Sequence, residues 1–569
     1  MDKGAMATFR FSWLVWGMLA PVLAWAEPGA RVIVKLKADS ALLSETTATA
    51  QAQSVSPLAS TGLARMQRLG SKAGVPLSNG RAIGPRMHVA QALGMSSEAL
   101  AAHLARQSDV EYAVVDELRK RSIIPNDPLY PESSTPPTIP NVRAGQWYLR
   151  PPVGSVRSSI NAEGAWDASY TAIGSVGSSS VVVAVLDSGV RSDHEDFVGK
   201  FVLPGFNMIA DPIRSGGVNR VADAEDRGDW LTQDEITNNP ISYPASYKCK
   251  ADETSSWHGM EVSGIIGAES NNALGMASVG GQTKVLPVRV LGKCGGLDSD
   301  IIQGMRWAAG LAVDGVSSAT APRARVINLS LGAASKACSA AYRDTISAVI
   351  NAGVVVVAAA GNESKAVDSP ANCDGVIAVA ALRHEGTKVG FSSVGPEVAI
   401  SAPGGNCVNP DGEECLYPII SASNSGASAP VAASDGGSSY SAALGTSFAT
   451  PMVSGTVALM LAVRPTLTPA AVKAVLKNSA RPFPTSGVAS ASAACHAPTD
   501  TEQLECYCTT TTCGAGMLDA GAAVAQATGV IPVVSVSTTS AVAGQPITFG
   551  SAGSMPSQVG SGIVNRPGF

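Results

Sequence analysis

The stretch VVVAVLDSGV, residues 181–190, decides the fold that we predict for this chain. Its apolar residues run without alternation up to Asp187, and a turn-forming Ser-Gly pair follows. A continuous apolar run between turns is typical of a strand buried on both faces, as in a parallel sheet. Comparable runs occur at residues 285–291, 326–329, 354–360, 376–380 and 398–402.

Helical patterns separate these apolar runs. They cover residues 258–268, 299–309, 337–351 and 447–463. Valine-rich strands that alternate with helices indicate an α/β fold, in which helices flank an open, mostly parallel sheet. In such sheets functional groups collect at the carboxyl ends of the strands, so the residues that follow the runs are the first candidates for chemistry.

The composition excludes several classes of protein. Hydrophobic residues make up 45% of the 569 residues and charged residues 15%, which allows a large core and excludes wholesale disorder. The net charge of −5, without a long basic block, argues against a nucleic-acid partner. We find no internal stretch of about 20 apolar residues that could span a bilayer.

The N-terminus predicts export. Lys3 and Arg10 precede the apolar run FSWLVWGMLAPVLAWA, residues 11–26. The run ends in the small-x-small site Ala24-Trp25-Ala26. This pattern predicts a signal peptide, residues 1–26, and a secreted, extracellular protein that has no membrane contact after its removal. The alternative is a membrane anchor, but the run is short and Pro21 interrupts it.

The ten cysteines lie between Cys249 and Cys513. An even number in an exported chain favours disulfide bonds, whose pairing cannot be deduced from spacing. A zinc site is the weaker alternative, because His496 is the only histidine beside the cysteines.

Residues 27–125 form a basic front segment, with 12 Lys or Arg and 8 Asp or Glu, whereas the rest of the chain is acidic. Strand patterns at 31–37 and 110–115 and a helical pattern at 97–107 indicate a small α+β unit. Opposite charges would let it dock on the remainder as a pro-segment. An independent N-terminal domain is the alternative that composition leaves open.

Three polar residues lie where the sheet rule expects chemistry. Asp187 follows the first strand, His258 opens the helical stretch SWHGMEVSGIIGA (256–268), and Ser447 opens GTSFATPMVSGTVALMLAV (445–463). Singly, the Asp and Ser are more simply explained as helix or turn caps. Together they form a constellation in which a histidine takes the serine proton and a buried carboxylate fixes the histidine tautomer.

These motifs carry a family resemblance. DSGV around Asp187, HGMEVSG around His258 and GTSFATPMVSG around Ser447 resemble, in the same order, the three signatures of the subtilisin-like serine proteases. The resemblance implies that residues 27–125 are an inhibitory pro-domain, 126–528 the peptidase domain and 529–569 a C-terminal tail. The second motif departs from the family's usual HGTHVAG at Met260 and Glu261, and Glu261 could alter the electrostatics of the cleft.

The same resemblance implies further site residues. Asn362, at the end of VVVVAAAGN (354–362), matches the family's oxyanion asparagine, with the backbone N–H of Ser447 as second donor. By itself, Asn362 could equally form a turn after Gly361.

The resemblance also implies the substrate-binding edges. One wall of the primary specificity pocket corresponds to Ser330, Leu331 and Gly332, and the other to Ala360 and Gly361. A second substrate-binding edge corresponds to Gly295 and Gly296. An extended peptide would add between these edges as a strand. Their small, apolar character predicts a preference for large apolar or aromatic side chains. We interpret Asp298-Ser299-Asp300 as a capped helix start.

Calcium is the predicted cofactor, in a structural role. Asp196 and Asn272 resemble a calcium site of the family, and Asp127 is a candidate third ligand. A solvated surface loop is the alternative. The acidic stretch 223–229 has no diagnostic spacing.

The C-terminal tail is too short for a complete module. CGAGMLDAGAAVAQA (513–527) resembles a helix of the family, and the alternating stretch 533–554 resembles the beginning of a β-sandwich. A truncated module, a removable tail and a disordered linker all remain open.

These features predict a secreted serine endopeptidase, a monomer acting on protein or peptide substrates and made as a precursor that its own pro-domain inhibits. Self-cleavage is expected near residues 121–125, although the run Arg119-Lys120-Arg121 leaves another protease open. An esterase of the α/β-hydrolase type would need a G-x-S-x-G elbow and the order Ser, Asp, His, and neither is present. A noncatalytic peptide-binding protein on a protease scaffold is the remaining alternative.

Overall fold

The computed structural model describes residues 29–44, 57–116, 123–132, 144–252, 254–316, 324–334, 336–406, 416–488, 491, 493–529, 535–536 and 549–550. The predicted signal peptide, the basic run 119–121 and two of the cysteines, Cys407 and Cys415, lie outside the described residues. The chain divides into two compact units, Met1–Arg121 and Ser122–Phe569.

The first unit is a three-stranded antiparallel sheet with the order β2-β1-β3. Its elements are β1 (Ala30–Leu36), α1 (Ala41–Ser44), α2 (Pro57–Ala73), β2 (Met87–Ala92), α3 (Ser97–Leu104) and β3 (Val110–Val115). Alternate residues of β1 are buried, and Val32 of this face packs in one core with Met66 of α2 and Leu100 of α3. The α+β pattern of the front segment is therefore present, with α1, α2 and β2 as additions.

The second unit contains a seven-stranded sheet with the order β10-β9-β8-β7-β4-β6-β5, and its paired strands are all parallel. The strands are β4 (Val182–Asp187), β5 (Phe206–Asn207), β6 (Lys284–Arg289), β7 (Val326–Leu329), β8 (Val355–Ala359), β9 (Ile377–Leu382) and β10 (Val398–Pro403). Six of them coincide with the predicted runs to within two residues, and the predicted α/β fold class is confirmed.

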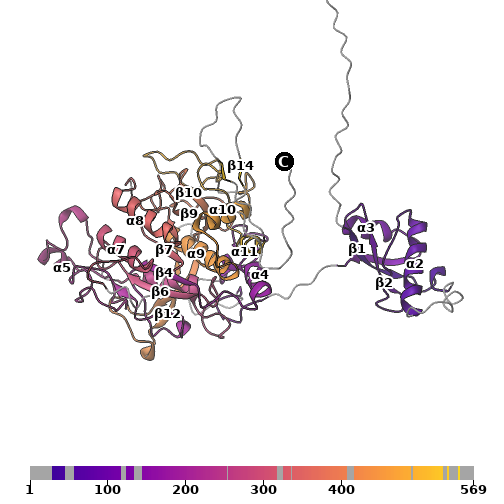
Figure 1. Ribbon diagram of the computed structural model, residues 1–569, viewed down its shortest axis with the longest axis horizontal. Coiled ribbons are helices and arrows are strands. Elements are labelled where there is room, and N and C mark those ends of the chain that lie inside the picture. Colours follow the sequence, from indigo (N-terminus) through magenta and orange to yellow (C-terminus); the bar gives the residue numbers. More distant parts are fainter. Residues whose placement is uncertain are drawn as a thin grey trace, which may run out of the picture. The chain divides into compact units, whose positions relative to one another are not determined.

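Helices cover both faces of this sheet (Figure 1). One face packs against α7 (Asp298–Ala308) and α8 (Ala340–Asn351). The other packs against α4 (Ala162–Ile173), α6 (His258–Gly267), α9 (Thr446–Val463), α10 (Pro469–Ser479) and α11 (Ala520–Thr528). Successive strand residues face opposite cores, as Val182 and Val183 of β4 do, which explains why the strands are apolar throughout.

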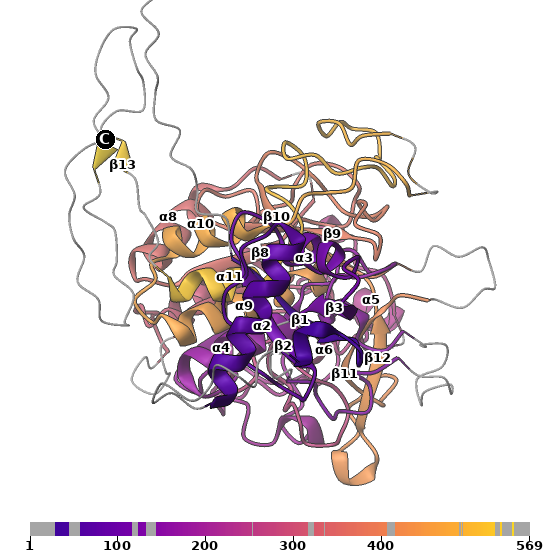
Figure 2. The ribbon, with the colours of Figure 1, turned by 90° about the vertical axis from the view of Figure 1, so that its right-hand side faces the viewer.

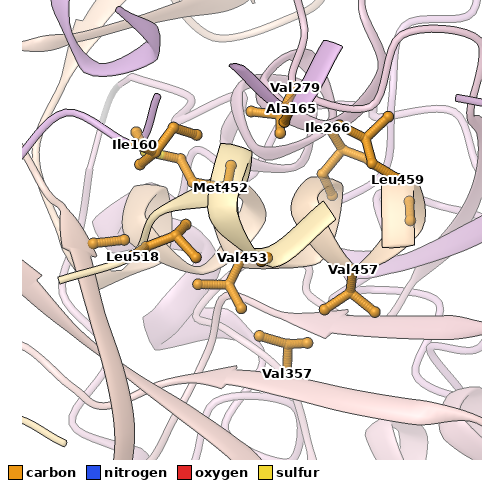
Figure 3. Close-up of a cluster of buried hydrophobic side chains, with 14 of the residues drawn as sticks. Ile160, Ala165, Ile266, Val279, Val357, Met452, Val453, Val457, Leu459 and Leu518 are labelled. Atoms are coloured by element: carbon orange, nitrogen blue, oxygen red, sulfur yellow. The ribbon is translucent and has the colours of Figure 1, made fainter. Parts of the chain in front are cut away.

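Helix α9 is buried on all sides. Val453 and Val457 face Val357 of β8, whereas Leu459 lies against Ile266 of α6 (Figure 3). Within the described part of the chain it is the one helix long and apolar enough to cross a membrane, and 89% of it is buried inside the protein. Its apolar character is therefore that of a core helix.

A hairpin and disulfide bonds complete the second unit. The antiparallel strands β11 (Ile419–Asn424) and β12 (Ser438–Ala443) form a hairpin, which lies beside α6 (Figure 2). A short helix, α5 (Gln233–Asn238), precedes α6 in the chain. The described disulfides are Cys249–Cys294, Cys338–Cys373, Cys495–Cys506 and Cys508–Cys513. No described cysteine is left over for zinc, so the disulfide interpretation holds for all of them. Of the tail, only the two-residue pair β13 (Ser535–Val536) and β14 (Phe549–Gly550) is described.

Candidate active site

Asp187 and His258 meet at the carboxyl end of the sheet. Asp187 is the last residue of β4, and His258 is the first residue of α6. The His258 Nδ1 atom lies 2.8 Å from Asp187 Oδ1, and Asp187 is only 1% exposed. The backbone N–H of Ser188 donates to the same carboxylate oxygen, also at 2.8 Å. A buried carboxylate therefore faces one nitrogen of the ring, which leaves Nε2 for another partner.

A buried polar network fixes α6 against the end of β4. The Ser188 hydroxyl donates to Asp226 Oδ2 at 2.7 Å and accepts from the Gly259 N–H at 2.9 Å. Arg289 Nε donates to the Ser188 carbonyl at 2.9 Å. A Cβ on Gly259 would lie 2.2 Å from the carbonyl oxygen of Gly189, so only glycine permits this approach. The sequence placed Asp226 in an acidic stretch without a role, because nothing local links it to Ser188.

The carboxylates around His258 favour its protonated form. Burial alone lowers the pKa of the imidazole, but the Asp187 carboxylate, with smaller contributions from Glu261 and Asp229, raises the pKa to about 9. Burial raises the pKa of Glu261 to about 7, although its carboxylate accepts a hydrogen bond from the Ser441 hydroxyl. Glu261 thus contributes to the electrostatics of this region through its negative charge, which acts on His258.

Ser447 is the second residue of α9, and its hydroxyl and its carbonyl both bond to Ser330. Its hydroxyl donates to the Ser330 carbonyl at 3.2 Å, and its own carbonyl accepts from the Ser330 hydroxyl at 2.7 Å. That carbonyl lacks a helical partner because Pro451, four residues on, has no N–H.

The described hydrogen bonds join His258 to Asp187 but not to Ser447. The ring of Phe448, the residue after Ser447, lies 5.6 Å from the His258 ring.

Asn362 follows β8 and is held by Thr446. Its side-chain oxygen accepts from the N–H and the hydroxyl of Thr446, both at 3.0 Å, which turns its NH₂ group the other way. A Cβ placed on Gly445 would lie 3.6 Å from Asn362 Nδ2 and 3.6 Å from Ser447 N. The two nitrogen atoms thus lie near one point, as the two donors to an oxyanion must.

A cavity of about 360 Å³ lies beside His258. Five of the seven residues that the sequence assigned to substrate binding line it: Gly295, Gly296, Ser330, Leu331 and Gly332. The other two, Ala360 and Gly361, are not in its lining, although the Gly361 N–H lies 3.3 Å from the Thr446 hydroxyl. The lining also holds residues to which the sequence assigned no part in substrate binding: Asp229, Asp298, Tyr342 and Ser369.

The Asp298 side chain does not cap α7. The capping position is Leu297, which offers no side-chain acceptor, and Asp298 is the first helical residue. Its carboxylate accepts instead from the Tyr342 hydroxyl of α8 at 3.0 Å. The interpretation of this stretch as a capped helix start was wrong, because a long-range contact takes the side chain.

The three residues predicted to bind calcium lie close together. Asp196 accepts from Asn272 Nδ2 at 2.8 Å and from the Met276 N–H at 2.9 Å, and Asp127 accepts from the Asn271 N–H at 2.9 Å. Both carboxylates are fully buried, and among the described residues Asp127 Oδ1 has no partner.

Burial raises the pKa of Asp127, and burial together with the charge of Asp127 raises the pKa of Asp196 to about 6. Two buried acids, one of them with an unused oxygen, fit a hard metal ion.

Comparisons with known proteins place the chain among proteins of known family. The profile described as the subtilase family matches residues 178–516. The chain is similar to an extracellular protease of Xanthomonas campestris pv. campestris, with 37% identity over 68% of this chain and 58% of the relative. It is also similar to an extracellular basic protease of Dichelobacter nodosus, with 35% identity over 67% of this chain and 56% of the relative.

A solved structure of proteases from Pseudoalteromonas arctica matches with a TM-score of 0.56 and 35% identity, over 71% of this chain and 99% of that one. The chain thus matches somewhat more than half the length of its curated relatives.

Proposed function

The chain belongs to the subtilase family, and we propose that it is a serine endopeptidase that cleaves peptide bonds through an acyl-enzyme. The observation that carries the proposal is the 2.8 Å contact between His258 Nδ1 and the buried Asp187 carboxylate, next to the helix that begins with Thr446 and Ser447. In this proposal Ser447 is the nucleophile, His258 the general base and Asp187 the group that orients the imidazole.

The reaction proceeds in two halves. Ser447 Oγ attacks the carbonyl carbon of the substrate while His258 Nε2 takes the hydroxyl proton, and Asp187 stabilises the imidazolium. The oxyanion accepts hydrogen bonds from Asn362 Nδ2 and Ser447 N. The C–N bond then breaks as His258 returns the proton to the leaving amine. Water, activated by the same imidazole, hydrolyses the acyl ester and restores the Ser447 hydroxyl.

The substrate lies as an extended strand beside the cleft. Residues Ser330 to Gly332 offer backbone groups on one side and Gly295 with Gly296 on the other, and these lie in the lining of the cavity beside His258. Ala360 and Gly361 form the second wall of the pocket for the residue on the acyl side of the cleaved bond.

The proposal extends to export and maturation. Residues 1–26 act as the signal peptide, and residues 27–125 assist folding and then inhibit residues 126–528 until cleavage. The protein acts outside the cell as a monomer, without nucleic acid or membrane. The names of its relatives, which include extracellular proteases, support this location.

The proposal also includes calcium as a structural cofactor. Asp127, Asp196 and Asn272 would hold it, since two buried carboxylates and an unused oxygen suit a hard cation. The ion would neutralise their charge and tie residue 127 to the loop that follows α6, a structural role.

A serine-directed organophosphonate tests the function. We expect the folded, mature protein to be labelled covalently on Ser447, as peptide mapping by mass spectrometry would show. Ser447→Ala should stay unlabelled, and Ser454→Ala, which changes a buried serine of the same helix, should be labelled like the wild type. Folded wild type that takes no label would instead support the noncatalytic peptide-binding alternative.

A further inference from the structure

The segment of Asp368 and Ser369 connects the two predicted walls of the primary specificity pocket. The Asp368 N–H donates to the Ala360 carbonyl of one wall at 2.8 Å. The Ala333 N–H, directly after the other wall, donates to the Ser369 carbonyl, also at 2.8 Å. The segment therefore crosses between the chain ends that follow β7 and β8. Its Ser369, but not Asp368, belongs to the lining of the cavity beside His258.

The Asp368 side chain occupies the space between the glycines of the two walls. A Cβ on Gly361 would lie 2.4 Å from Asp368 Oδ2, and a Cβ on Gly332 would lie 3.3 Å from the same atom. Asp368 is only 3% exposed, and among the described residues its Oδ1 atom has no hydrogen-bond partner. A buried carboxyl group with unused acceptor capacity is costly unless a ligand uses it.

A second carboxyl group adds to the first. Glu363 is hydrogen-bonded to Asp368, and its Oε2 atom accepts from the Asn362 N–H at 2.8 Å. Burial and the charge of Glu363 raise the pKa of Asp368. In the described part of the chain no Lys, Arg or His forms an ion pair with either acid. The two carboxyl groups thus form a buried acidic pair that has no cationic partner among the described residues.

The cleft beside these residues also carries acids, with His258 as the one basic side chain of its lining. Asp229 and Asp298 belong to the lining of the cavity next to His258, and that lining contains no Lys or Arg. Acids along one edge attract a cationic peptide before it is bound.

We propose that Asp368, supported by Glu363, is the specificity-determining residue of this site and selects Lys or Arg on the acyl side of the cleaved bond. The inference rests on the proposed peptidase function. The cationic end of the substrate side chain reaches between Gly332 and Gly361 and donates a hydrogen bond to the unused Asp368 oxygen. Small, apolar walls alone predict the opposite preference, so one assay decides between the two.

The test uses the mature protein obtained by expressing the full-length chain. Its substrates are internally quenched peptides that differ only in the residue before the cleaved bond: Lys, Arg, Gln, Leu or Phe. We expect kcat/KM for Lys and Arg to exceed that for Leu and Phe at least tenfold. Asp368→Asn should lower it at least tenfold for Lys and Arg and less than threefold for Gln and Leu. Asp374→Asn, which changes an exposed acid six residues on, should leave the whole series unchanged.

Benzamidine, a small aromatic cation, provides a second reading. It should compete with the Lys peptide on wild type and on Asp374→Asn but not on Asp368→Asn, and near-ultraviolet circular dichroism should show all three folded. Preference of wild type for Leu or Phe, or an equal loss on all peptides in Asp368→Asn, would overturn the proposal. Absence of cleavage together with absence of organophosphonate labelling would instead refute the peptidase function itself.

Discussion

The imidazole of His258 combines two requirements that pull its protonation in opposite directions. As a base it must be neutral, yet the buried Asp187 carboxylate that orients it, 2.8 Å away, stabilises the charged form. The Asp187 carboxylate raises the pKa of His258 to about 9 and so favours the protonated ring. Only the neutral fraction can take the Ser447 proton, so the active fraction grows as pH rises.

The pH dependence of Glu261→Gln tests this at the residue scale. The negative charge of Glu261 helps raise the pKa of His258, and its own pKa of about 7 leaves it ionised where His258 titrates. We expect kcat/KM of the wild type to rise with pH through the alkaline range. The midpoint of this rise should lie lower in the variant. Glu397→Gln, at an exposed site, should keep the wild-type midpoint, and an unmoved midpoint in Glu261→Gln would contradict the account.

The helices and strands could be predicted where apolar residues form a long run in the sequence. The strands β4 and β6 to β10 and the helix α9 have long apolar runs, and their sequence alone located them. The hairpin strand β12 (SSYSAA) was missed because small polar residues give no strand signal, and the two-residue β5 is too short for any.

The site divides in the same way. The motifs around Asp187, His258 and Ser447 are contiguous in sequence and could be recognised. Asp368 could not, because it lies in the turn-like stretch ESKAVDSP and only the contact between Ala333 and Ser369 gives it a place. Nor could the sequence foresee that Ser447 bonds to Ser330, since the bond depends on a backbone carbonyl.

Gly259→Ala tests the contact between two elements. The added Cβ would lie 2.2 Å from the Gly189 carbonyl, which forces α6 away from the end of β4. We expect a loss of about 1–3 kcal/mol in the free energy of unfolding and at least a tenfold lower kcat/KM. Gly390→Ala, where an added Cβ meets nothing within 4 Å, is the control for a glycine loss by itself. Equal behaviour of the two variants in urea unfolding and in the peptide assay would refute this role of Gly259.

At the scale of the whole molecule, one large unit serves one site, and a smaller unit precedes it. The front unit, up to Arg121, has its own core between a sheet and two helices. The remainder combines a seven-stranded sheet with disulfide bonds, which suit an oxidising compartment. Both features fit an exported protein that folds as a precursor.

Precursor processing tests the role of the front unit. Ser447→Ala should accumulate in purified form with residues 27–125 attached, whereas wild type should lose them by cleavage near residues 121–125. Ser454→Ala should mature like the wild type. Gel mobility and N-terminal sequencing give the readout. Normal maturation of purified Ser447→Ala would exclude self-processing and point to cleavage by another protease at the basic run.

Calcium removal tests the predicted metal residues. Chelation should lower the thermal midpoint of the mature wild type, because a ligand at about 100 times its Kd adds about 2.7 kcal/mol of stability. Asp196→Asn should have a lower midpoint that no longer responds to calcium or chelator. Glu195→Gln, its exposed neighbour, should respond like the wild type. A wild-type midpoint that is insensitive to the chelator would contradict a calcium role.

The covalent intermediate on Ser447 is the central claim. Mature protein is mixed with a peptide ester, quenched in acid within milliseconds and digested, and the peptides are weighed by mass spectrometry. We predict an acyl group on the fragment that contains Ser447, present during turnover and absent in Ser447→Ala. Rapid formation of product with no acyl group on that fragment, or with one on a different residue, would contradict the account.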